Sequence, residues 1–111
     1  MINHEIDKAV EEMSQEFNTV RRKLGVEEVM AQLGEESAEL AKAALKYRRA
    51  LDGHNPTTVD LAEAENNLQE EFADVLMCMV ILVINDETVA NIIRYKMLRW
   101  VNRLEKAGNE E

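Results

Sequence analysis

Four carboxylates on two neighbouring segments are the side chains of this chain best suited to chemistry. Glu36 and Glu39 are three residues apart, as are Glu71 and Asp74, so each pair would share one face of a helix. Residues 75–84 are apolar without a break and predict a buried helix. A carboxylate beside a buried helix is costly unless it reaches water or is neutralised by a cation. The spacing therefore leaves two interpretations, solvated acids or a cation site.

The segments that must position these acids are predicted to be helical. Apolar residues recur at spacings of three and four, and strand-type alternation is absent. We predict helices over residues 2–24, ended by Gly25; from 27 or 28 to about 51; from about 59 to 84, with Thr58 as the N-cap; and from 87 to about 106, capped by Asp86 and stopped by Gly108. Residues 1–111 are thus expected to form a single all-α domain, a four-helix-bundle-like fold with a long central antiparallel hairpin of the second and third helices.

The turn at residues 52–56 places the two acidic pairs level with each other. Counted from this turn, Glu39 comes opposite Glu71, and Glu36 comes opposite Asp74. Because the axes of packed helices are about 8–10 Å apart, the four carboxylates can converge between them. Four carboxylates at that range repel one another unless a cation neutralises them.

The converging acids would form an oxygen-only ligand set, because neither His4 nor His54 falls near them. Such a set is typical of Mg²⁺, with Mn²⁺ as an alternative. A chain this rich in glutamate also produces the spacing by chance, and the alternative is a group of solvated helix faces. The predicted metal ligands are Glu36, Glu39, Glu71 and Asp74.

Basic residues concentrate in the last predicted helix. Lys96 and Arg99 are three residues apart and share a face with Arg103. In one interpretation these cations complement the helix dipole and pair with glutamates. In the other they hold phosphate oxygens beside a metal–carboxylate site. Trp100 and Tyr95 fit either a helix core or stacking on a nucleobase.

The acidic composition restricts the partners that we expect. The formal net charge is −9, whereas binding to the phosphate backbone of duplex nucleic acid depends on Lys and Arg. The apolar run is far shorter than the roughly 20 residues that span a bilayer, and residues 1–10 lack the apolar region of a signal peptide. The single cysteine, Cys78, is expected to be a reduced core residue. We therefore expect a cytoplasmic, soluble protein without a duplex nucleic acid or membrane partner.

The apolar run at residues 75–84 also indicates a subunit contact. The third helix would bury more surface than three short neighbours easily cover. A homodimer or homotetramer is the expectation, and the alternative is that the fourth helix covers this surface within one chain.

The motifs around the acids resemble a known enzyme family. Glu36-x-x-Glu39 within GEESAEL, followed by Glu71-x-x-Asp74 within EEFADVLM, resembles the metal-binding signature of the MazG-like all-α nucleoside triphosphate pyrophosphohydrolases. The resemblance covers about residues 26–105. The interval between the two motifs is longer than in that family, and the level register predicts that both arms of the hairpin are lengthened together.

The resemblance implies hydrolysis of a nucleoside triphosphate between its α and β phosphates, which releases the monophosphate and pyrophosphate. One or two Mg²⁺ ions held by the four acids would clamp the triphosphate and activate water. Glu36 and Glu39 are equal candidates for the catalytic base. Lys96 and Arg99, in KMLRWVNRLE, resemble the family's basic motif and would bind the substrate phosphates. The resemblance also implies a homodimer or homotetramer with sites near the subunit interface.

Other functions stay open at this point. The wider superfamily includes dUTP pyrophosphatases and the phosphoribosyl-ATP pyrophosphatase of histidine synthesis, which the motifs alone do not separate. A family member that binds nucleotides without cleaving them is a further possibility. The alternative from a different class is a non-enzymatic helical interaction module, in which the third helix mediates assembly and the acids face solvent.

Overall fold

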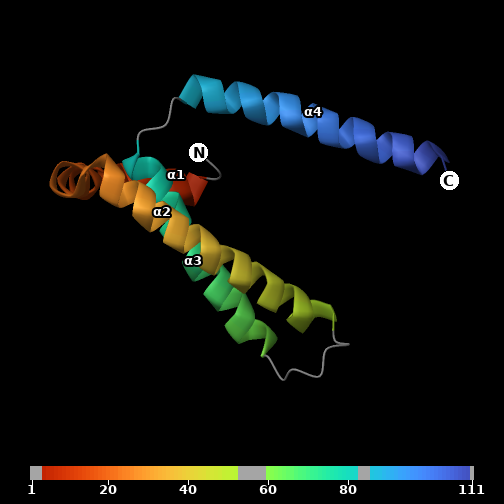
Figure 1. Cartoon of the computed structure of the whole chain (residues 1–111), viewed down its shortest axis with the longest axis horizontal. Helices are drawn as coiled ribbons and strands as arrows, with labels where there is room; N and C mark the ends of the chain where they lie inside the picture. The colour runs from red at the N-terminus through yellow and green to blue at the C-terminus, as the bar shows by residue number, and fades with distance from the viewer. Residues whose placement is uncertain (1–3, 53–59, 83–85, 111) are drawn as a thin grey trace.

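The computed structural model describes residues 4–52, 60–82 and 86–110, and these are helical throughout apart from the helix ends. The four helices are α1 (His4–Glu12), α2 (Ser14–Asp52), α3 (Leu61–Ile81) and α4 (Asp86–Glu110), as Figure 1 shows. No strand occurs among these residues, so the predicted all-α class is confirmed. None of the helices in these three ranges has both the length and the apolar character that crossing a bilayer requires.

The helix predicted over residues 2–24 corresponds to α1 together with the first part of α2. The amide of Met13 donates to the carbonyl of Ala9, and the amide of Phe17 donates to that of Met13, so helical hydrogen bonding continues across the junction. The real interruption is at Gly25, whose φ of 77° and ψ of 165° are non-helical. A positive φ is accessible to glycine because it lacks a Cβ. Gly25 therefore ends this N-terminal helix, as predicted, and the chain changes direction there.

The start of α3 differs from the prediction. Asp60 has extended backbone angles, and its side chain accepts a hydrogen bond from the amide of Ala62 at 3.1 Å, so Asp60 is the N-cap. The predicted cap, Thr58, lies outside the described residues. Both residue types satisfy a free amide at a helix start, so the sequence pattern alone does not separate them. At the other end α3 stops at Ile81, earlier than predicted.

The fourth helix is longer than the sequence predicts. It begins at Asp86 itself and runs through Gly108 to Glu110, so the prediction that Gly108 stops the helix is wrong. A terminating glycine usually adopts a positive φ, and among the described glycines only Gly25 does so. Glycine inside a helix costs about 1 kcal/mol relative to alanine, which the long helix tolerates.

The main packing contact joins α2 and α3, which lie side by side in Figure 1. A small core at one end consists of buried Val29, Cys78 and Ile81, with Phe17, Val20, Leu33 and Leu82 packed against it. Arg21 ties the N-terminal helix to the end of α3. Its Nε donates to the carbonyl of Ile81 at 2.8 Å, and its Nη2 donates to the carbonyl of Val80 at 3.1 Å. These bonds satisfy carbonyls that a helix end leaves free.

The last helix stands apart from this core. α4 makes no extensive contact with α1, α2 or α3, and every side chain from residue 91 to 108 is exposed. Figure 1 shows it extending away from the α2–α3 pair. The radius of gyration is 17.6 Å, whereas a compact domain of this length has one of about 13 Å. The described part of a single chain therefore does not close into a four-helix bundle.

Candidate metal centre

The contact between α2 and α3 positions the acids of the candidate site. On α3, the buried residues Ala64 and Cys78 lie seven residues to either side of Glu71. A spacing of seven keeps side chains on one face of a helix, so Glu71 lies on the face that packs against α2. Asp74, three residues later, lies on the same side. The apolar repeat thus holds two carboxylates against α2.

Three of the four predicted ligands come together at this contact. One carboxylate oxygen each from Glu36, Glu71 and Asp74 lies within 4.8 Å of the other two. All three side chains are half-buried. Glu36 is further oriented by Gln32, one turn earlier on α2, whose Nε2 donates to Glu36 Oε1 at 2.8 Å. The sequence interpretation did not anticipate Gln32, although its position four residues before Glu36 is a usual one for such a bond.

Glu71 occupies the most unfavourable position of the three in the absence of a cation. Its Oε2 is buried and has no hydrogen-bond partner. Burial raises the pKa of the Glu71 carboxyl, and the charges of Asp74, Glu36, Glu39 and Glu70 raise it further. A buried oxygen among like charges gains from a cation, which would satisfy the oxygen and cancel the repulsion.

Glu39, the fourth predicted ligand, lies at the edge of the group. Its charge reaches Glu71, but Glu39 is outside the set of oxygens that converge. Its Oε1 is 3.9 Å from Lys42 Nζ, and both side chains are more than half exposed. An exposed ion pair of this kind is worth about 0–1 kcal/mol, so Lys42 holds Glu39 only weakly.

Cys78 is a core residue that also senses the charges of the acidic group. It is buried, as predicted for a core residue. Its pKa is raised by burial, and then by the charges of Glu36 and Asp74. Since the thiolate and not the thiol is the metal ligand, the raised pKa disfavours sulfur ligation here. The available donors are therefore carboxylate oxygens, and this donor set fits a hard cation such as Mg²⁺ or Mn²⁺.

The predicted phosphate-binding residues lie on α4. Lys96 and Arg99 are exposed and, with Trp100 and Arg103, line a shallow pocket of about 240 Å³. The Arg99 guanidinium carbon lies 5.6 Å from the centre of the Tyr95 ring, within the range of a cation–π contact. Because α4 packs extensively against neither α2 nor α3, a single chain does not place these cations beside the three acids.

Comparison of the whole chain with protein-family models, with curated proteins and with solved structures finds no match. The case for a function therefore rests on the chemistry of the site and on the motifs that surround it.

Proposed function

We propose that this chain is a Mg²⁺-dependent nucleoside triphosphate pyrophosphohydrolase of the cytoplasm, which converts (d)NTP to (d)NMP and pyrophosphate. The observation that carries the proposal is the convergence of Glu36, Glu71 and Asp74 around a buried, partnerless oxygen of Glu71. This geometry supports a cation site, and the motifs that contain these acids supply the type of reaction.

Each acid has a role in this proposal. Glu36, Glu71 and Asp74 would hold the cation, and Glu39 would supply a fourth ligand once its weak contact with Lys42 is broken. The remaining oxygens of Glu36 and Glu39 are the candidate bases for accepting the proton of the attacking water. Bound Mg²⁺ supplies positive charge that neutralises the acids and the triphosphate.

The proposal includes assembly of the protein as a homodimer or homotetramer, with the α2–α3 pair as the central hairpin of a helical bundle. The support is the set of apolar side chains that α4 leaves exposed. In the assembled protein, Lys96 and Arg99 bind the phosphate oxygens of the substrate.

The proposal is tested by incubating the purified protein with a panel of NTPs and dNTPs that includes dUTP and phosphoribosyl-ATP. Pyrophosphate release is measured with Mg²⁺, with Mn²⁺ and with a chelator. We expect metal-dependent release from at least one nucleotide. Asp74→Asn removes a ligand charge and should reduce this release by at least about 10–100-fold, the loss typical of replacing a residue that only supports a metal ligand. Glu65→Gln, at an exposed acid on the same helix, should not reduce it.

A second candidate function is a non-enzymatic helical interaction module, which the exposed apolar side chains of α4 favour. It predicts that the acids are solvated and that Mg²⁺ leaves the melting temperature unchanged. Absence of pyrophosphate release from the whole panel, together with an unchanged melting temperature, would favour this candidate. Binding of a nucleotide without turnover would instead indicate a non-cleaving member of the resembled family.

A further inference from the structure

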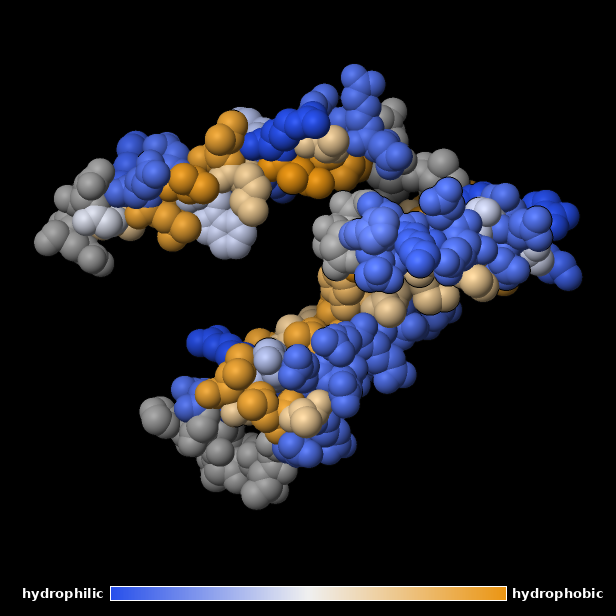
Figure 2. Space-filling view, turned by 180° about the vertical axis from the view of Figure 1, so that it is seen from behind, coloured by the Kyte–Doolittle hydropathy of each residue, from blue (hydrophilic) through white to orange (hydrophobic). Residues whose placement is uncertain are grey.

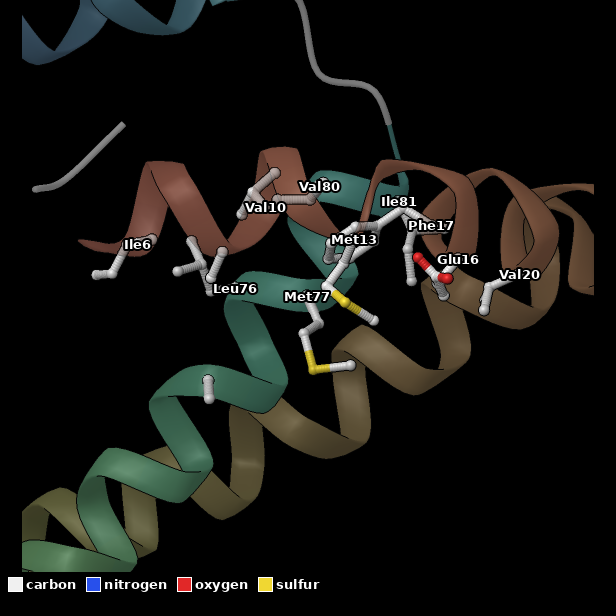
Figure 3. Close-up of a pocket in the computed structure, with 12 residues that line it drawn as sticks. Ile6, Val10, Met13, Glu16, Phe17, Val20, Leu76, Met77, Val80 and Ile81 are labelled. Atoms are coloured by element: carbon white, nitrogen blue, oxygen red, sulfur yellow. The ribbon is translucent and has the colours of Figure 1, made fainter. Parts of the chain in front are cut away.

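An apolar groove lies between the N-terminal helix and the C-terminal half of α3. Its volume is about 360 Å³, and among its twelve lining residues only Glu16 is charged. Figure 3 shows Val10 and Met13 of the N-terminal helix near Met77 and Val80 of α3 where the two ribbons cross, with Ile6 further toward the start of the N-terminal helix. A groove with such walls is suited to an apolar helix face.

The helix face of matching character is on α4. Ile93, Met97, Trp100 and Leu104 follow spacings of four, three and four, so they share one face, here called the α4 stripe. Each of the four side chains is more than half exposed. Figure 2 shows apolar residues gathered mainly along the side of α4 that faces the rest of the molecule. Helices in proteins are stabilised chiefly by packing such a face.

The exposed area has the magnitude of a subunit interface. The accessible surface of the chain is 9061 Å², whereas a compact monomer of 12.7 kDa has about 6,200 Å². The excess is about 2,800 Å² per chain, or about 5,600 Å² for two chains, which reaches the upper end of the range of about 2,000–5,000 Å² or more, counted over both partners, that obligate dimers bury.

The charges at the two surfaces are complementary. On the groove side, Glu16 lies in the wall, and Glu70 lies one turn before the first groove residue of α3. On α4, Lys96, Arg99 and Arg103 follow one edge of the α4 stripe at spacings of three and four. Opposite charges at the rim favour association and fix orientation.

We propose that the groove of each chain is occupied by the α4 stripe of a second copy, in a reciprocal exchange that closes a two-fold dimer. In the structure the chain's own α4 extends away from the α2–α3 pair (Figure 1), which leaves the groove open to another copy. In a two-fold dimer the α4 stripe of each chain covers the groove of the other, so both apolar surfaces are buried in both chains. The contact requires neither metal nor nucleotide, so it is tested separately from the proposed hydrolysis.

The interface also predicts that two chains share each substrate site, an inference that rests on the proposed function. The partner's Lys96, Arg99 and Arg103 would lie next to α3, the helix that carries Glu71 and Asp74. The substrate site would then take its carboxylates from one chain and its phosphate-binding cations from the other.

The interface is tested by measuring molecular mass in solution, with light scattering and sedimentation, in buffer without metal or nucleotide. We expect the wild type to be a dimer, and Met97→Asp on the α4 stripe and Met77→Asp in the groove to halve its mass. Leu98→Asp is the matched control, because Leu98 is 73% exposed and points away from the stripe. It should remain dimeric. Circular dichroism confirms that each variant is helical.

Mixing the two monomeric variants distinguishes the possible occupants of the groove. The Met97→Asp chain has an intact groove and the Met77→Asp chain has an intact stripe, so the mixture should contain a mixed dimer with one complete contact. A monomeric wild type, with α4 closed onto its own groove or left free, would overturn the proposal. A Met77→Asp variant that stays dimeric would also overturn it, since the α4 helices would then pair with each other.

A cross-link makes the test independent of the affinity of the mixed dimer. In a Cys78→Ala background, Met97→Cys chains are mixed with Met77→Cys chains that carry a different tag, and a short bismaleimide is added. We expect a covalent product that contains both tags. Leu98→Cys in place of Met97→Cys should give little of it. Equal yields from the two α4 positions would contradict the proposed contact.

Discussion

α3 and α4 are helices of similar length, with 21 and 25 residues, and both carry apolar residues at helical spacing. α3 buries its Ala64, Cys78 and Ile81, whereas α4 buries no side chain between residues 91 and 108. α3 also carries acids that converge with one from α2, while the basic residues of α4 face solvent. A single chain therefore carries its converging acids on α2 and α3 and its basic residues on α4, and it does not bring the two groups together.

The acids of the proposed site lie on α2 and α3, and its cations lie on α4. Removing the cations of α4 should have the largest effect on activity. Lys96→Ala combined with Arg99→Ala should lower kcat/KM by about 10²–10⁴-fold, because each of the two lost hydrogen bonds to a charged group is worth about 1.5–3 kcal/mol. The metal-dependent melting temperature should not change. If the double variant retains full activity, the substrate phosphates are held elsewhere.

The acids of α2 and α3 should respond to metal without any contribution from α4. Mg²⁺ at a hundredfold excess over its dissociation constant stabilises the fold by about 2.7 kcal/mol, which raises the melting temperature of a chain of this size by about 10–20 °C. The pKa of Glu71 is raised, so protons compete with the metal at mildly acidic pH. The gain should be complete above this raised pKa and shrink as the pH falls through it, as calorimetry at several pH values would show.

Replacing Glu71 separates two effects of its carboxylate on stability. One is the repulsion that destabilises the metal-free protein, and the other is the stabilisation gained when Mg²⁺ binds. In the absence of metal, ionised Glu71 opposes folding at pH values above its raised pKa, and protonation relieves this repulsion as the pH falls. Glu71→Gln should therefore raise the melting temperature of the metal-free protein by a few degrees at neutral pH and abolish the response to Mg²⁺. Glu65→Gln, which removes an exposed charge from the same helix, serves as the control and should leave both quantities unchanged. A lower melting temperature for metal-free Glu71→Gln would contradict the repulsion.

The smallest predicted effects are changes in the free energy of unfolding when a glycine is replaced next to the core or in α4. Gly25 has a positive φ, so Gly25→Ala should destabilise the protein by about 1–3 kcal/mol through backbone strain. Gly108 is inside α4 with open space around it. Gly108→Ala should therefore be neutral or stabilising by about 0.5–1 kcal/mol. Urea denaturation of both variants measures the difference, and equal effects would show that the bend at Gly25 is not required.

The parts of the structure that depend on local pattern could be predicted from the sequence. The all-α class and the interruption at Gly25 follow from apolar spacing and from glycine. Counting from the turn placed Glu36 near Glu71 and Asp74 correctly. It did not give the direction of the exposed Glu39 side chain, because a long flexible side chain at the edge of a contact has several rotamers.

The position of α4 could not be predicted for a different reason. The apolar spacing of Ile93, Met97 and Leu104 indicates that a face is to be buried, but it does not say against which surface or in which chain. The helix also passes through Gly108 because helical hydrogen bonding continues there in the absence of a positive φ. Tertiary context, and not local propensity, decides both features.

Arg21 has a consequence for how fast a partner helix can bind. Its two hydrogen bonds to the carbonyls of Ile81 and Val80 hold the N-terminal helix across the end of α3, so the walls of the groove are in place before association. A preorganised receptor spares binding the entropic cost of ordering its own side chains. Association should then proceed near the usual rate for rigid protein pairs, about 10⁵–10⁷ M⁻¹s⁻¹, without a slow unimolecular phase.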